Sequence, residues 1–159
     1  MKRFFVVLLV LSLASVFLAT TLGVFAGKEI GGRERFYLGA TFKTDDLLGL
    51  GIDVMHPVKD FSTATEELSD VDVLELNPLL YLNFGQDTKI YIGVGPIIIM
   101  DIETYDFSLY SKDILRGKAG ISMNLGMITL FAEGVTAFSY SPFATTGIYG
   151  IQGGIGLNF

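Results

Sequence analysis

The sequence predicts an all-β fold, a small up-and-down antiparallel transmembrane β-barrel, and three observations lead to this fold class. Apolar and polar residues alternate along most of the chain, which is the pattern of strands with one apolar and one polar face. Short turns and longer loops follow one another in turn between these strands. The segment 147–159 is an amphipathic strand that ends on Phe159. We expect eight strands, because a barrel of this kind normally has an even number.

The N-terminal segment predicts a secretory signal peptide at 1–26. Lys2 and Arg3 precede an apolar run at 4–19, and small residues follow at 20–26, which is the order of regions in such a peptide. An uncleaved membrane anchor is the alternative, since the apolar run is of marginal length for a helix that crosses ~30 Å of hydrocarbon. Cleavage would leave one domain, the barrel at 27–159.

Seven strands can be read from the alternation, at 35–43, 47–55, 71–84, 89–102, 114–124, 127–140 and 147–159. Short turns are expected at 44–46, 85–88 and 126, and longer loops at 57–70, 104–112 and 141–146. Pro57 is expected to end the second strand, because proline has no N–H to donate to a strand ladder. The eighth strand has two possible sources, 16–29 and 61–67, and the N-terminal one is preferred.

The two faces of these strands differ in polarity. One face is almost entirely apolar, with aromatic residues near the strand ends, and we expect it to contact lipid. The other face should line the lumen, and its charged residues are Lys43, Asp53, Glu75, Asp101, Arg116, Lys118 and Glu133. These charges form either an ion-pair network that plugs the interior or a polar constriction in a pore. The plug is preferred, because eight strands leave room only for side chains.

The closing segment resembles the last strand of bacterial outer-membrane barrels. Tyr149, Ile155, Leu157 and Phe159 share its apolar face. The resemblance implies that these residues form the signal read by the barrel assembly machinery. It also implies that this machinery and outer-membrane lipid are the partners of the chain.

Several segments resemble the OmpW-like family of small outer-membrane barrels. They are Y-L-G-A-T-F-K-T-D-D-L-L-G-L-G-I-D-V-M-H-P-V-K-D (37–60), L-N-P-L-L-Y-L-N-F (76–84), I-Y-I-G-V-G-P (90–96) and G-I-G-L-N-F (154–159). Val58 departs from the family, which has an aromatic residue after this proline. The resemblance implies an eight-stranded barrel in the cell outer membrane, with a narrow path for a small hydrophobic ligand.

Three functions stay open at this point. The first is a channel for small hydrophobic molecules, as the resemblance implies. The second is a structural or surface-interaction barrel with a plugged lumen, which acts through its loops. The third is a soluble, exported, lipocalin-like barrel whose apolar face surrounds a ligand.

Composition and motifs argue against other functions. A formal net charge of -6 disfavours nucleic acid as a partner. The chain has no cysteine and therefore no disulfide or thiol nucleophile. His56 is the only histidine, and no triad-like motif surrounds it. We expect no enzyme activity, no cofactor and no metal site.

Overall fold

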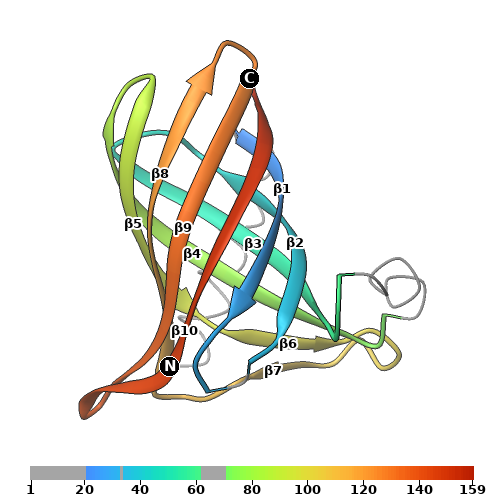
Figure 1. Ribbon diagram of the computed structural model, residues 1–159. Helices are drawn as coiled ribbons and strands as arrows, with labels where there is room; N and C mark the ends of the chain where they lie inside the picture. The colour runs from blue at the N-terminus through green and yellow to red at the C-terminus, as the bar shows by residue number, and fades with distance from the viewer. Residues whose placement is uncertain (1–20, 33, 62–70) are drawn as a thin grey trace.

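In the computed structural model, which describes residues 21–32, 34–61 and 71–159, the chain forms a closed antiparallel barrel of eight wall strands (Figure 1). The strands are β1 (Thr21–Glu29), β2 (Phe36–Lys43), β3 (Leu48–Val58), β4 (Val73–Gly85), β5 (Thr88–Pro96), β6 (Ile98–Asp101), β7 (Phe107–Leu109), β8 (Ile114–Leu125), β9 (Ile128–Tyr140) and β10 (Phe143–Asn158). The predicted all-β, eight-stranded, up-and-down barrel is confirmed. None of the described residues lies in a helix that is long and apolar enough to cross a membrane.

Closure of the barrel depends on β1, which pairs with both β2 and β10. Its register with β10 runs from Thr21 opposite Asn158 to Glu29 opposite Gly150. On the far side of the barrel, β3 pairs with β4 and completes the circle. Of the two sources considered for the eighth strand, the structure uses the N-terminal one. The other, at 61–67, lies outside the described residues except for Phe61.

The first strand overlaps the segment predicted to be the signal peptide. The predicted boundary between Ala26 and Gly27 falls six residues into a strand of nine residues. In the structure, the barrel therefore begins at Thr21 at the latest and not at Gly27. Residues 1–20, which hold the rest of the predicted signal peptide, lie outside the described part of the chain.

Alternate residues of the wall strands face outward and inward. In β1, Leu22, Val24 and Ala26 are exposed, whereas Phe25 and the other residues of its parity are buried. Lys28 is the only Lys, Arg, Asp or Glu at an outward position of the described wall strands. The outward surface is therefore almost uncharged, and the charged residues of the walls lie inside.

The two ends of the barrel are built differently (Figure 1). Short turns at 44–47, 86–87 and 126–127 join strands at the end where the last residue, Phe159, also lies. The opposite end carries the connection at 30–35, the β6–β7 hairpin and the tip of the β9–β10 hairpin. The predicted alternation of short turns and longer connections is thus present, although some strand and loop bounds differ from the predicted ones.

Pro57 does not end its strand as predicted, because β3 continues to Val58. Pairing with β2 extends to Val58 opposite Phe36, whereas pairing with β4 stops at Met55 opposite Glu75. Proline is tolerated here because β3 has a strand partner on only one side beyond Met55.

Two other segments also differ from the prediction. The single strand predicted at 89–102 is interrupted at Ile97 and forms two strands, β5 and β6. Both pair with β4 in the same register. On its other side β5 pairs with β8, whereas β6 pairs with β7. The loop predicted at 141–146 is only the turn at 141–142, since β9 and β10 extend beyond the wall as a hairpin. A register shift between Thr145 and Tyr149 marks the start of this extension. Thr146 Oγ1 stabilises it by donating to the carbonyl of Ala137 (2.7 Å).

Candidate functional site in the barrel interior

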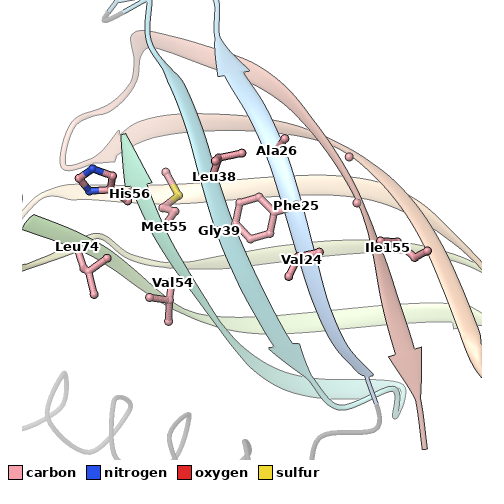
Figure 2. Close-up of a pocket in the computed structure, with 12 residues that line it drawn as sticks. Val24, Phe25, Ala26, Leu38, Gly39, Val54, Met55, His56, Leu74 and Ile155 are labelled. Atoms are coloured by element: carbon pink, nitrogen blue, oxygen red, sulfur yellow. The ribbon is translucent and has the colours of Figure 1, made fainter. Parts of the chain in front are cut away.

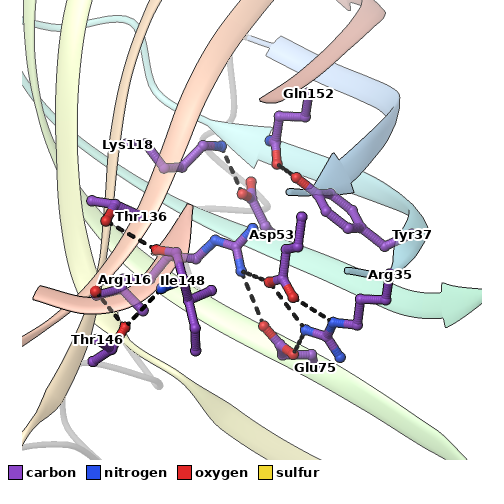
Figure 3. Close-up of polar contacts among 12 residues, drawn as sticks. Arg35, Tyr37, Asp53, Glu75, Arg116, Lys118, Thr136, Thr146, Ile148 and Gln152 are labelled. Carbon is purple, nitrogen blue, oxygen red and sulfur yellow. Dashed lines mark hydrogen bonds and ion pairs between the residues drawn. The ribbon is translucent and has the colours of Figure 1, made fainter. Parts of the chain in front are cut away.

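The interior of the barrel gathers most of the charged residues predicted to line the lumen. Six of them are buried, on five different wall strands: Lys43, Asp53, Glu75, Arg116, Lys118 and Glu133. Each lies at an inward position because the alternation of its strand continues without interruption. Their contacts form two connected groups of ion pairs (Figure 3).

The first group lies toward the end of the barrel that carries the hairpins. Arg35, from the connection between β1 and β2, pairs with Glu29 (Nε to Oε2, 2.7 Å) and with Glu75 (Nη2 to Oε2, 2.5 Å). Arg116 approaches the same carboxylates from β8, with Nη1 3.1 Å from Glu75 Oε1 and 3.9 Å from Glu29 Oε1. Two guanidinium groups thus share two carboxylates, and Figure 3 shows them meeting across the lumen.

The second group is centred on Lys118, whose side chain is fully buried. Its Nζ lies 2.7 Å from Asp53 Oδ2 and 2.7 Å from Glu133 Oε2. The hydroxyl of Tyr91 donates to Glu133 Oε1 (2.7 Å), and Gln152 Nε2 donates to Glu133 Oε2. The hydrogen bonds complete the coordination of a buried carboxylate, as burial of a charge requires.

A third set of contacts closes the end with the short turns. Lys89 pairs with Asp45 (Nζ to Oδ2, 2.8 Å), which also accepts a hydrogen bond from Thr21 Oγ1 (3.3 Å). Lys43 lies between this pair and the second group, with its Nζ 4.1 Å from the centre of the Tyr91 ring. A cation over an aromatic face is attracted by the ring quadrupole.

Charges of the two signs balance inside the barrel. Among the described residues, the interior contacts involve five carboxylates, Glu29, Asp45, Asp53, Glu75 and Glu133, and five cations, Arg35, Lys43, Lys89, Arg116 and Lys118. Sequence reasoning missed four of these residues, Glu29, Arg35, Asp45 and Lys89. The inward parity of 21–29 could have identified Glu29, and that of the strand after Thr88 could have identified Lys89.

Five buried aromatic rings pack beside these polar groups, and each lies directly opposite a glycine on the neighbouring strand. The pairs are Phe25 with Gly39, Tyr37 with Gly27, Tyr81 with Gly93, Tyr91 with Gly120, and Phe131 with Gly154. At Gly93, a Cβ atom would lie 2.6 Å from Cε1 of Tyr81, so only glycine leaves space for the ring. These glycines thus leave space for the rings inside the barrel.

Asp101 is the one predicted lumen residue that the structure places elsewhere. It ends β6, beyond the interruption at Ile97, and is partly exposed. Its Oδ1 accepts a hydrogen bond from the backbone N–H of Thr104 (2.9 Å), which lowers the pKa of the Asp101 carboxyl. The alternation continues past Ile97, but the strand there no longer pairs with β8 and no longer lines the lumen.

A shallow apolar hollow of about 600 Å³ lies on β1 to β4 and β10 (Figure 2). Outward side chains such as Val24, Val54 and Ile155 line it, with His56 at one edge. The ring Nδ1 of His56 lies 2.9 Å from the carbonyl oxygen of Val73. In the described part of the chain, no group of three or more His, Asp or Glu side chains is placed to hold a metal ion.

The residues of the predicted assembly signal lie on the outward side of β10 or directly after it. Tyr149, Ile155, Leu157 and Phe159 are all exposed, Phe159 most of all at 74%. They continue the apolar surface formed by Leu22 and Val24 on the adjacent strand β1.

Comparison with known proteins supports the fold. The sequence matches no protein-family model and no curated protein. The structure is similar to the crystal structure of Neisserial surface protein A (NspA), with a TM-score of 0.53 and 10% sequence identity, over 87% of this chain and 95% of that one. The N-terminal β-barrel domain of Pseudomonas aeruginosa OprF is more distant, at a TM-score of 0.45 and 17% identity, over 89% and 98% of the two chains. The likeness to NspA is one of fold.

Proposed function

We propose that this protein is an exported outer-membrane β-barrel with a closed lumen, which acts as a structural or surface-interaction protein through the hairpins at one end. The observation that carries the proposal is the combination of an almost uncharged, apolar exterior with a charge-balanced interior lined by buried side chains. No catalytic group and no cofactor are part of the proposal.

The exterior supports a location in lipid. Large apolar side chains are exposed on β1, β4, β5, β8, β9 and β10, and water-soluble monomers rarely expose contiguous apolar patches larger than about 300–600 Å². The shortest wall strand, β2, has 8 residues, and the other seven have 9 to 16. At ~3.3 Å per residue and a tilt of ~40°, strands of about 8 to 10 residues cross an apolar layer of about 20–25 Å. A lipocalin-like barrel requires the opposite facing, with its apolar side chains inside.

The interior supports a plug and not a channel. Tyr37, Tyr81 and Tyr91 are each at most 1% exposed, and the ion pairs join strands that are not neighbours in the barrel wall. Opening a water-filled path would require separation of these buried pairs, which is strongly unfavourable. A channel for small hydrophobic molecules, and membership of the OmpW-like family, stay predictions from the sequence.

The hairpins at the end opposite Phe159 offer a surface for contacts. Phe143 at the tip of the β9–β10 hairpin is 80% exposed, and Tyr105 in the connection between β6 and β7 is 70% exposed. Long connections face outward in outer-membrane barrels and short turns face the periplasm. In the proposed orientation, these aromatic side chains are therefore at the cell surface.

The test has two parts. Cell fractionation should recover the protein in the outer membrane, resistant to extraction by alkali, and planar-bilayer recording of the refolded protein should show no steady ion conductance. Recovery in the soluble periplasm would overturn the location. Large steady conductance, with an ion selectivity that changes in Arg116→Glu, would overturn the closed lumen.

The closing strand is also proposed to direct assembly. The outward aromatic and aliphatic residues of β10, ending with Phe159, have the alternation that the barrel assembly machinery would read. Phe159→Asp should reduce the amount of protein in the outer membrane without lowering synthesis, as measured by quantitative immunoblotting. Leu22→Asp on adjacent β1 is the control, and an equal loss for both variants would indicate a general effect of charge in lipid.

A further inference from the structure

We propose that the barrel interior binds a small cluster of water molecules between its two groups of ion pairs, held by Arg116, Asn77 and Asp53. The inference concerns only the interior and does not depend on the proposed location or function of the protein.

Five buried polar atoms of these three residues have no hydrogen-bond partner in the part of the chain that the structure describes. They are Nε and Nη2 of Arg116, both side-chain amide atoms of Asn77, and Oδ1 of Asp53. The three residues are 2%, 0% and 0% exposed, respectively. Buried polar groups are nearly always hydrogen-bonded, because burial without a partner is unfavourable. Each of these atoms therefore requires a partner other than the atoms that the structure describes.

The strand register places the three residues together. Asn77 lies directly opposite Asp53 in the pairing of β3 with β4. It is also two residues from Glu75, to which Arg116 donates from β8, the next strand but one in the wall (3.1 Å). Arg116 and Lys118 occupy successive inward positions on β8, and Lys118 binds the other oxygen of Asp53 (2.7 Å). Asn77 thus lies between the Arg116–Glu75 pair and the Lys118–Asp53 pair.

The chemistry of the free atoms fits water better than an ion. The guanidinium edge formed by Nε and Nη2 of Arg116 offers two parallel donors, while Asp53 Oδ1 can only accept. Asn77 offers both a donor and an acceptor. An anion could bind the arginine edge but would be repelled by the Asp53 carboxylate. Water both donates and accepts, and buried waters commonly make about three such bonds.

The balance of charges also favours water, which is a neutral ligand. Among the described residues, Arg35 and Arg116 offset Glu29 and Glu75 in the first group, and Lys118 and Lys43 offset Asp53 and Glu133 in the second. A neutral ligand such as water preserves this balance of charges, whereas a bound anion or cation would disturb it. Water would then connect the two groups in one continuous hydrogen-bonded network along the lumen.

A crystal structure of the purified protein, with a second data set from a crystal soaked in bromide, tests the inference directly. We expect solvent density within hydrogen-bond distance of Arg116 Nε or Nη2, of Asn77, and of Asp53 Oδ1, with no anomalous bromide peak there. A bromide peak at this site would show that it binds an anion and would overturn the proposal that it binds water. Direct bonds from all five atoms to other protein atoms would overturn the site.

The variant Asn77→Leu gives an independent test, because the two explanations predict different changes in the urea midpoint of unfolding. If water bridges Asn77 to its neighbours, Asn77→Leu should lower the urea concentration at the midpoint of unfolding. If the amide is simply unpaired, removal of a buried unsatisfied group should leave the midpoint unchanged or raise it, and this result would overturn the proposal. Asn83→Leu is the control, since Asn83 Nδ2 donates directly to the carbonyl of Asp46 (2.6 Å) and its loss should lower the midpoint in either case.

Discussion

The absence of a side chain at Gly93 leaves the space that the Tyr81 ring occupies in the lumen. In Gly93→Ala, the new Cβ would lie 2.6 Å from Tyr81 Cε1, so the ring must move into space that other side chains fill. We expect the unfolding free energy to fall by about 1–3 kcal/mol, as for other overpacked cores. Because the chain has no tryptophan, circular dichroism in urea is a suitable measurement.

Gly134→Ala is the matched control for this substitution. Gly134 faces outward on β9, and the nearest atom to an added Cβ is the Ala119 carbonyl oxygen at 3.8 Å. Alanine should be tolerated here, and it reduces the conformational entropy of the unfolded chain. Equal destabilisation at the two positions would contradict the role given to the interior glycines.

Lys118 is the residue whose loss should disturb the ion pairs most. Lys118→Met would leave Asp53 and Glu133 buried without their shared cation, and breaking a buried pair in this way costs about 3–5 kcal/mol. Lys28→Met, at the outward edge of β1, should change the unfolding free energy by less than about 1 kcal/mol. Denaturant titrations of the two variants provide the comparison, and a small effect of Lys118→Met would show that the pairs contribute little.

Alternation predicts the inward position of a residue only while its strand remains in the wall. It placed Asp53 and Arg116 inside because β3 and β8 keep two wall partners at these positions. It failed for Asp101, since the strand leaves the wall at Ile97. Arg35 has the inward parity of Tyr37 in the strand predicted at 35–43, yet it was not among the predicted lumen residues. In the structure it lies in the connection before β2, and its side chain reaches Glu29.

At the level of elements, β1 was the strand hardest to recognise. Its outward residues, Leu22, Val24 and Ala26, are small or aliphatic and directly continue the apolar run of the predicted signal peptide. Periodicity has no clear start where one apolar segment merges with the next. The inward residues of the same strand, among them Phe25 and Glu29, distinguish it from the apolar run of the predicted signal peptide.

The position of β1 leads to a prediction about processing. If a signal peptide is removed, cleavage must occur before Thr21, since β1 pairs with β10 along its entire length. Mass spectrometry of the protein extracted from membranes should find an N-terminus at Thr21 or at an earlier residue. An N-terminus at Gly27 would remove six of the nine residues of β1 and would contradict the closed barrel.

At the scale of the whole molecule, the barrel reverses the usual distribution of polarity, with charges inside and apolar side chains outside. If lipid covers the exterior, Ile92→Arg at the middle of β5 should lower the unfolding free energy by about 2–4 kcal/mol. Ile128→Arg, beside the turn at 126–127, should cost only about 0–1 kcal/mol, because arginine there can reach water. Urea unfolding of both variants in lipid vesicles measures the difference, and equal costs would contradict the proposed depth of insertion.

The pairing of Thr21 with Asn158 brings the two ends of the described barrel together. A short linker from Phe159 to Thr21 would therefore join them without moving a strand. New chain ends could then be placed at a different turn between two of the eight wall strands. Opening it after Phe84 gives a circularly permuted chain whose final residues are Leu82, Asn83 and Phe84, the same three residues found at 157–159. The order in which the strands are synthesised would change, while the set of strand neighbours would not.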